Sequence, residues 1–256
     1  MANLVIATYN TWKCDGEYLL RLDAMAKGLL SINADVLMLQ EVFVETRGAW
    51  HTADFLADAL GMHWCYLPAR EKKRKVSGVL SQSQSGLAIL SRYPILSQGG
   101  MELSTHPEDG DRKVLWAEIH VSRTLLLIAN THLTHLKQAD EIRQIQTQEI
   151  ARQLSQNHCG KEIILGGDFN AQPKSPALAW LEDTKGGGAV NAAADSGAKF
   201  KNTLIENNTL TCVDHLYRLS DGIRWHKYRV GLNKKNPQGI YPSDHAAVIA
   251  ELELDA

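Results

Sequence analysis

Short apolar runs recur along the whole chain, and most of them end in a polar or ionisable side chain. This pattern constrains the fold more than any other feature, because short runs rich in Val, Ile and Leu are typical of buried strands. Segments with apolar residues at helical spacing, such as Leu22, Met25 and Leu29, lie between the runs. Strands that alternate with a few helices predict an α/β or α+β sandwich. The predicted strands are 4–9, 34–41, 62–67, 86–97, 113–121, 124–131, 162–167, 222–230 and 246–254, and the predicted helices are 17–33, 51–60, 136–157 and 175–183.

The composition is that of an ordinary globular domain. The 256 residues are 44% hydrophobic and 22% charged, which excludes collagen-like, disordered and coiled-coil chains. No internal repeat or linker interrupts the sequence, so we expect one domain over residues 1–256. The formal net charge of -2 disfavours a protein whose whole surface binds long nucleic acid.

The four cysteines, at 14, 65, 159 and 212, form no C-x-x-C motif, and we interpret them as scattered buried thiols. The N-terminus has no signal-peptide pattern, and no apolar run is long enough to cross a bilayer. We therefore expect a cytoplasmic protein, with a monomer as the default oligomeric state.

Three segments are predicted to be loops. The segments 186–199 and 233–238 contain turn-forming residues and predict mobile loops. The basic run from Arg70 to Lys75 is interpreted as a solvated loop, with contact to a polyanionic substrate as the alternative.

The polar residues at the strand ends are of the types that hold hard cations and phosphates. Mg²⁺ prefers oxygen ligands, which suits Glu41 and Asp244 with the amide oxygen of Asn10 as a neutral supplement. Asp168, in Gly-Gly-Asp-Phe-Asn, can hold or deprotonate an attacking water, and Asn170 can donate to phosphoryl oxygens.

Two histidines complete the candidate set. Asp214 is suited to fix the tautomer of His245 and to favour its charged form. His132 follows a strand end and, taken alone, is more typical of a structural imidazole. Each candidate residue has such a structural alternative, but the alternatives would all have to hold at successive strand ends.

These strand-end motifs resemble the endonuclease/exonuclease/phosphatase superfamily, and they follow its order from residue 3 to residue 254. The motifs are Thr8-Tyr9-Asn10-Thr11-Trp12, Leu39-Gln40-Glu41-Val42, Ser85-Gly86-Leu87-Ala88-Ile89-Leu90-Ser91-Arg92-Tyr93-Pro94-Ile95, Asn130-Thr131-His132-Leu133, Gly166-Gly167-Asp168-Phe169-Asn170 and Ser243-Asp244-His245. The resemblance implies an α/β fold, a four-layer α/β/β/α sandwich of two packed mixed sheets flanked by helices. It also implies hydrolysis of a phosphoester that depends on Mg²⁺ or Mn²⁺.

The resemblance also implies residue roles. Glu41 is the main metal ligand, with Asn10 and Asp244 nearby. Asp168 orients or activates the water, and Asn170 supports the transition state. His245, paired with Asp214, holds the scissile phosphate, whereas His132 contacts the phosphate or assists the leaving group. Whether Asp168 or His245 is the general base stays open.

The Thr131-His132-Leu133 motif resembles the deoxyribonuclease, phosphatase and sphingomyelinase branches. The leading hypothesis is a metal-dependent phosphodiesterase or phosphatase that acts on a small or lipid-like phosphoester. The alternative is a nuclease on DNA or RNA, with phosphate contacts from the basic run and from Lys227, Arg229, Lys234 and Lys235. A sphingomyelinase with a membrane contact through Trp225, Tyr228 and Tyr241, and a non-catalytic scaffold, rank lower.

Overall fold

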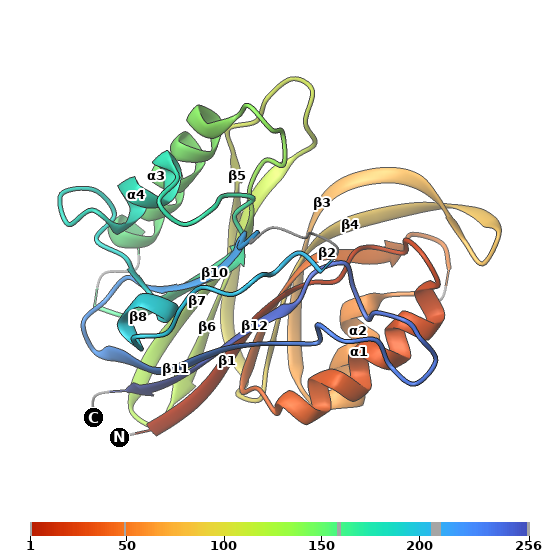
Figure 1. Cartoon of the computed structure of the whole chain (residues 1–256), viewed down its shortest axis with the longest axis horizontal. Helices are drawn as coiled ribbons and strands as arrows, with labels where there is room; N and C mark the ends of the chain where they lie inside the picture. Colours follow the sequence, from red (N-terminus) through yellow and green to blue (C-terminus); the bar gives the residue numbers. More distant parts are fainter. Residues whose placement is uncertain (1, 49, 158–159, 206–210, 255–256) are drawn as a thin grey trace.

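The computed structural model describes residues 2–48, 50–157, 160–205 and 211–254, and it consists of two packed β-sheets with helices on both outer faces (Figure 1). The strands are β1 (Ala2–Asn10), β2 (Val36–Glu45), β3 (His63–Val76), β4 (Val79–Ser91), β5 (Ile95–Leu103), β6 (Arg112–Val121), β7 (Thr124–His132), β8 (Glu162–Asp168), β9 (Val190–Asn191), β10 (Asp214–Arg218), β11 (Ile223–Gly231) and β12 (Ala247–Leu254). The helices are α1 (Tyr18–Ile32), α2 (Thr52–Leu60), α3 (Asp140–Asn157), α4 (Pro176–Glu182) and α5 (Ala192–Asp195).

Each sheet is six-stranded and mixed. The first has the order β11-β12-β1-β2-β4-β3, and the second has the order β5-β6-β7-β8-β10-β9. The parallel pairs are β1 with β2 and β7 with β8, and each pair lies near the middle of its sheet. Parallel neighbours bring their carboxyl ends to the same edge, so the residues that follow β1, β7 and β8 can meet there.

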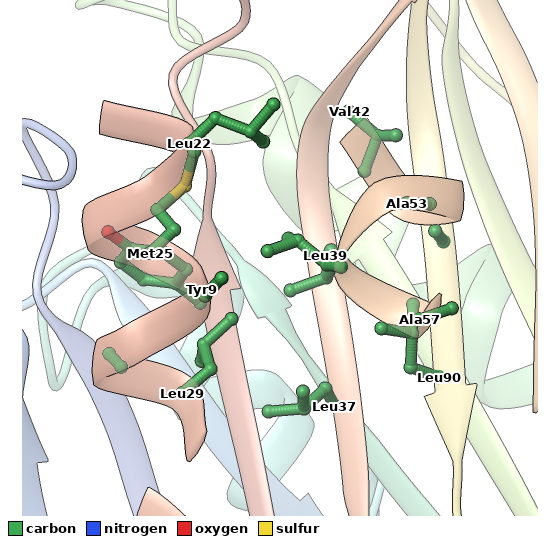
Figure 2. Close-up of a cluster of buried hydrophobic side chains, with 14 of the residues drawn as sticks. Tyr9, Leu22, Met25, Leu29, Leu37, Leu39, Val42, Ala53, Ala57 and Leu90 are labelled. Atoms are coloured by element: carbon green, nitrogen blue, oxygen red, sulfur yellow. The ribbon is translucent and has the colours of Figure 1, made fainter. Parts of the chain in front are cut away.

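Helices α1 and α2 cover the outer face of the first sheet. Leu22, Met25 and Leu29 are at helical spacing in α1 and are buried against the sheet, with Ala53 and Ala57 of α2 beside them (Figure 2). Helix α1 ends at Ile32 and is capped by Asn33, which has a left-handed conformation (φ 58°) and whose backbone N–H donates to the carbonyl of Leu29.

Two further apolar layers complete the sandwich. Side chains such as Met38, Ile128 and Val248 fill the space between the two sheets. On the other side, Ile150 of α3 and Leu178 of α4 pack on the second sheet. These layers confirm the predicted four-layer α/β/β/α sandwich.

The sequence-based prediction is wrong in the region of β3 to β5. The single predicted strand 86–97 is the end of β4 and the start of β5, which belong to different sheets. Strand β3 continues through the basic run to Val76, so the predicted loop from Arg70 to Lys75 is a strand. Together β3 and β4 form a long hairpin that arches beyond the end of β2 (Figure 1).

Three smaller differences concern the second half of the chain. The predicted helix 136–157 begins only at Asp140, and β10 was not predicted. The segment 186–199, predicted as a loop, contains β9 and α5. Asn191 caps α5, because its side-chain oxygen accepts a hydrogen bond from the backbone N–H of Ala193 at 2.9 Å.

Cys14, Cys65 and Cys212 are free and buried, as predicted, whereas Cys159 lies outside the described residues. Within the described ranges, no helix is both long and apolar enough to span a bilayer.

Candidate functional site

A cavity of about 620 Å³ lies at the edge where β1, β7 and β8 end, under the arch of the β3–β4 hairpin. All the predicted site residues except Asp214 line it. They are Asn10, Glu41, His132, Asp168, Asn170, Asp244 and His245. Asp214 is fully buried behind His245. The strand ends of both sheets therefore converge on one site.

Glu41 is placed by a bulge in β2. The register of β2 against β4 shifts between Leu39 and Val42, and Glu41 has a left-handed backbone conformation with φ 53°. A bulge bends its strand and re-aims a side chain, here toward the cavity. The buried amide of Gln40 ties the bulge to the second sheet, since its Nε2 donates to Oδ1 of Asn130 in β7 at 2.7 Å.

Asp168 is held through both of its carboxylate oxygens. The Nδ2 of Asn10 donates to its Oδ2 at 3.0 Å, and the backbone N–H of Asn170 donates to its Oδ1 at 2.9 Å. The residue before Asp168, Gly167, has no room for a side chain. Its φ is 150°, and a Cβ there would lie 2.1 Å from the carbonyl oxygen of Thr131.

His245 forms a buried cluster with two carboxylates. Its Nδ1 is 2.8 Å from Asp214 Oδ2, and its Nε2 is 3.8 Å from Asp168 Oδ2. Burial acts to lower the pKa of His245, but the charge and hydrogen bond of Asp214, together with the charges of Asp168 and Asp244, raise this pKa to about 10. His245 is therefore an imidazolium at neutral pH.

At Asp168, burial and the charge of a neighbouring carboxylate act in the same direction on the pKa. Burial, followed by repulsion from Asp214, raises the pKa of its carboxyl group to about 7, against the attraction of His245. A carboxyl group that titrates near neutral pH is suited to accept a proton.

His132 faces the same carboxylate, with its Nε2 3.5 Å from Asp168 Oδ2. Burial, reinforced by the positive charge of Arg112, holds the pKa of His132 well below its usual range. The structure thus places a neutral imidazole and a charged imidazole on two sides of Asp168.

The oxygen atoms of Asn10, Glu41 and Asp244 are the donor set that fits a hard divalent cation. Burial and the neighbouring carboxylate of Glu41 raise the pKa of Asp244, as expected for acidic groups that share one site, although its neighbour His245 opposes this shift. The ammonium of Lys13 lies 2.8 Å from Glu41 Oε2.

A second group of potential metal ligands consists of Asp168, Asp214 and His245, whose ligand atoms lie within 4.8 Å of one another. This group fits a metal less well, because His245 is charged and its Nδ1 is hydrogen-bonded to Asp214. The all-oxygen set is therefore the better candidate for a cation site, and the buried group is the candidate for proton transfer.

Arg21 is a site-supporting residue that the sequence did not indicate. It is 1% exposed, and all five of its N–H donors are used by backbone carbonyls. The acceptors are the carbonyl oxygens of Thr11, Trp12, Lys13, Asp15 and Pro242. One guanidinium thus joins the loop after Asn10 to the segment that carries Asp244 and His245.

Some predicted contact residues lie elsewhere. Trp225 is 2% exposed and packs between the sheets, which removes it from any membrane contact. Lys227 pairs with Glu251 at 2.8 Å, and neither it nor Arg229, Lys234 or Lys235 lines the cavity.

Comparison with solved structures supports the fold. An endonuclease/exonuclease/phosphatase from Bacteroides vulgatus has a TM-score of 0.76 at 16% identity, with 100% of each chain covered. A truncated Caenorhabditis elegans TDP2 has a TM-score of 0.70 at 19% identity over 98% of this chain and 97% of that one. A mannosyl-6-phosphatase from Bacteroides thetaiotaomicron has a TM-score of 0.75 at 20% identity over 98% and 100% of the two chains.

A search of curated protein sequences finds no match. The model of the Endonuclease/Exonuclease/phosphatase family matches residues 7–245, a span that contains every residue of the site described above. The chain therefore belongs to the endonuclease/exonuclease/phosphatase family.

Proposed function

We propose that this chain is a divalent-metal-dependent phosphoester hydrolase in which an activated water attacks phosphorus. The observation that carries the proposal is the single cavity in which the oxygen donors of Asn10, Glu41 and Asp244 face the same space as Asp168 and His245. The structurally similar mannosyl-6-phosphatase from Bacteroides thetaiotaomicron is in keeping with this class of reaction.

A bound Mg²⁺ or Mn²⁺, held by Asn10, Glu41 and Asp244, would polarise the phosphoryl group and offset its developing negative charge. The remaining steps belong to the protein. Asp168 is the base in this proposal, because both of its oxygens are oriented by hydrogen bonds and its pKa is raised to about 7. It accepts a proton from the attacking water.

His245 holds the scissile phosphate. Since its Nδ1 is used by Asp214, its Nε2–H is the donor that remains for a phosphoryl oxygen. The side chain of Asn170 donates one N–H to the carbonyl of Leu133 at 3.0 Å, which leaves a second N–H for the transition state. His132, held neutral, contacts the leaving group.

The first experiment is hydrolysis of a panel with Mg²⁺, Mn²⁺ or EDTA. The panel contains a phosphomonoester, a small phosphodiester, sphingomyelin and plasmid DNA. We expect turnover of at least one class only with metal, and an about 1,000-fold loss of kcat in Asp168→Asn. Glu41→Gln should raise the metal concentration needed for half-maximal rate.

The matched control is Asp58→Asn, which removes a carboxylate from the exposed face of α2. This variant should retain wild-type turnover. Turnover that persists in EDTA, or Asp168→Asn protein as active as wild type on a good substrate, would refute the proposed function.

A further inference from the structure

Two residues of the loop after β1 have an uncommon backbone conformation. Trp12 and Lys13 are consecutive non-glycine residues in the left-handed region, with φ 55° and 42°. Residues with a Cβ disfavour this conformation, and it persists where the surrounding structure imposes it. Here the backbone N–H of Trp12 donates to Asn10 Oδ1 at 2.9 Å, and Arg21 donates to the carbonyl oxygens of both Trp12 and Lys13. The loop is therefore held in a strained shape by residues of the site.

This shape places one ammonium group at the carboxylate of Glu41. The backbone N–H of Lys13 donates to the carbonyl of Glu41 at 3.2 Å, and its Nζ lies 2.8 Å from Glu41 Oε2. The two side chains are 27% and 16% exposed, so salt screens this ion pair less than a fully exposed one. Both residues line the cavity. The strained loop thus directs a cation to the main candidate ligand of the metal.

A divalent cation and this ammonium compete for the same carboxylate. Mg²⁺ binds oxygen ligands at about 2.1 Å, so a metal and an ammonium that both contacted Oε2 would lie at most about 5 Å apart. Like charges at this distance repel each other strongly. The ammonium of Lys13 therefore has to leave Glu41 when a divalent cation binds there.

Asp15 offers the ammonium a second position. Its Oδ2 lies 3.9 Å from the Nζ of Lys13, and its side chain is 50% exposed, which makes it more accessible than the carboxylate of Glu41. The carbonyl oxygen of Asp15 accepts from Arg21 Nε at 2.9 Å, so the loop that carries both residues keeps its shape. A rotation within the flexible lysine side chain is enough to exchange one carboxylate for the other.

We propose that Lys13 is an internal competitor for the divalent cation, and that its ammonium moves from Glu41 to Asp15 when the metal binds. The inference rests on the proposed function, since it takes Glu41 as a metal ligand. Lys13 acts through Glu41 and sets the metal concentration at which the site fills. It regulates the site without taking part in the chemistry.

The test measures binding of Mn²⁺ to the full chain without substrate, by calorimetric titration and by the paramagnetic resonance signal of free Mn²⁺. Lys13→Met removes the ammonium but keeps an unbranched side chain, so the backbone strain is the same. We expect its Kd for Mn²⁺ to fall about 10-fold, because the competing cation is gone. Lys13→Arg keeps a cation and should return Kd to within about 3-fold of wild type.

Asp15 gives an effect of opposite sign. Asp15→Asn removes the second position of the ammonium and should raise the Kd for Mn²⁺ about 3-fold. In the Lys13→Met background the same substitution should change Kd by about 1.5-fold or less, since no ammonium is left to move. An effect of Asp15→Asn that is equal in the two backgrounds would overturn the proposal.

The matched control is Lys113→Met. Lys113 also lines the cavity, but its Nζ lies 3.3 Å from Glu102 Oε1. This variant should keep Kd within about 2-fold of wild type. Urea unfolding followed by circular dichroism checks that every variant folds. Folded Lys13→Met with an unchanged or higher Kd would overturn the proposal, and so would an equal fall of Kd in Lys113→Met, because the effect would then be one of charge in general.

Failure of the proposed function gives a different result. If no phosphoester is hydrolysed, but Lys13→Met lowers the Kd for Mn²⁺ and Glu41→Gln raises it, the competition stands without the function. If hydrolysis depends on metal and Lys13→Met leaves Kd unchanged, the function stands and the inference fails. If Mn²⁺ binds neither wild type nor Lys13→Met, both fail.

Discussion

Replacement of Arg21 by Lys tests whether one guanidinium holds the loops of the site together. The substitution keeps the positive charge and most of the side-chain length. A lysine has three N–H donors, whereas Arg21 donates five hydrogen bonds of 2.9–3.0 Å to backbone carbonyls. At least two carbonyls therefore lose their partner in the Lys variant.

The cost can be worked from those two carbonyls. A buried polar group left without its hydrogen bond costs about 1–3 kcal/mol, so we expect Arg21→Lys to lower the free energy of unfolding by about 3 kcal/mol. In a chain of this size this corresponds to a fall in Tm of about 6–12 °C. Stacking of the guanidinium on Trp12, 4.7 Å from the ring centroid, is also lost.

Urea unfolding followed by circular dichroism measures the change, with Lys27→Met as the control on the same helix. Lys27 is exposed and, among the described residues, its one ion pair is with Asp23, so its replacement should change stability by less than about 0.5 kcal/mol. A free energy of unfolding for Arg21→Lys within about 0.5 kcal/mol of wild type, at an unchanged m-value, would refute the reasoning.

Three further predictions concern single residues. Gly167→Ala should cost about 3 kcal/mol in urea unfolding, because its φ of 150° is strained and the new Cβ would lie 2.1 Å from the carbonyl oxygen of Thr131. Burial acts to raise the pKa of the Asp109 carboxyl group, but hydrogen bonds, chiefly from Arg112, outweigh it and lower this pKa from 3.8 to about 2. The ionised group should therefore stabilise the fold above pH 3.8, and this stabilisation should be lost as pH falls toward about 2. Asp109→Asn, followed by acid titration of stability, should therefore remove about 1 kcal/mol at neutral pH, a figure already reduced for solvent screening. Asp168→Asn should have a higher free energy of unfolding than wild type at pH 8, and the difference should be smaller at pH 5. The raised pKa of about 7 means that the folded state favours the protonated acid, so the wild type loses stability as pH rises toward 7, whereas the Asn variant does not. Urea unfolding at both pH values checks this sign, and an Asn variant that is less stable at pH 8 would contradict it.

The sequence predicted the strand ends well, because a buried strand must be apolar and the first polar residue after it marks its end. Asn10 and Asp168 were located in this way, and the pairing of Asp214 with His245 agrees with the 2.8 Å contact. The four-layer α/β/β/α arrangement was implied by the resemblance of the ordered motifs to the endonuclease/exonuclease/phosphatase superfamily.

The hairpin was missed for a physical reason. Strand β3 beyond Leu67 is largely exposed, so no apolar run marks it. The period-two signal of Arg70, Lys72 and Arg74 was present, but Glu71 and Lys73 fill the positions between them and make the run look uniformly charged. The bulge at Glu41 and the carbonyl contacts of Arg21 depend on tertiary partners, which local sequence does not encode.

The charged side chains of the cavity form a negative group at the strand ends and a positive group on the β3–β4 hairpin, and the two groups act on an anionic substrate in opposite ways. Glu41, Asp168 and Asp244 at the strand ends repel a phosphate, whereas Lys13 and His245 beside them attract it. In the proposed function a divalent cation would offset the remaining negative charge, so that the scissile group can bind. The cations of the β3–β4 hairpin that line the cavity, among them Arg70, Lys72 and Arg74, attract anions through charges that salt screens. Metal dependence and salt dependence therefore report on different parts of one cavity: the first should govern the rate at Asp168, and the second the affinity for an anionic substrate. A chain with a formal net charge of -2 can in this way attract an anion, because the potential that the substrate meets is set by the nearby side chains and not by the total charge.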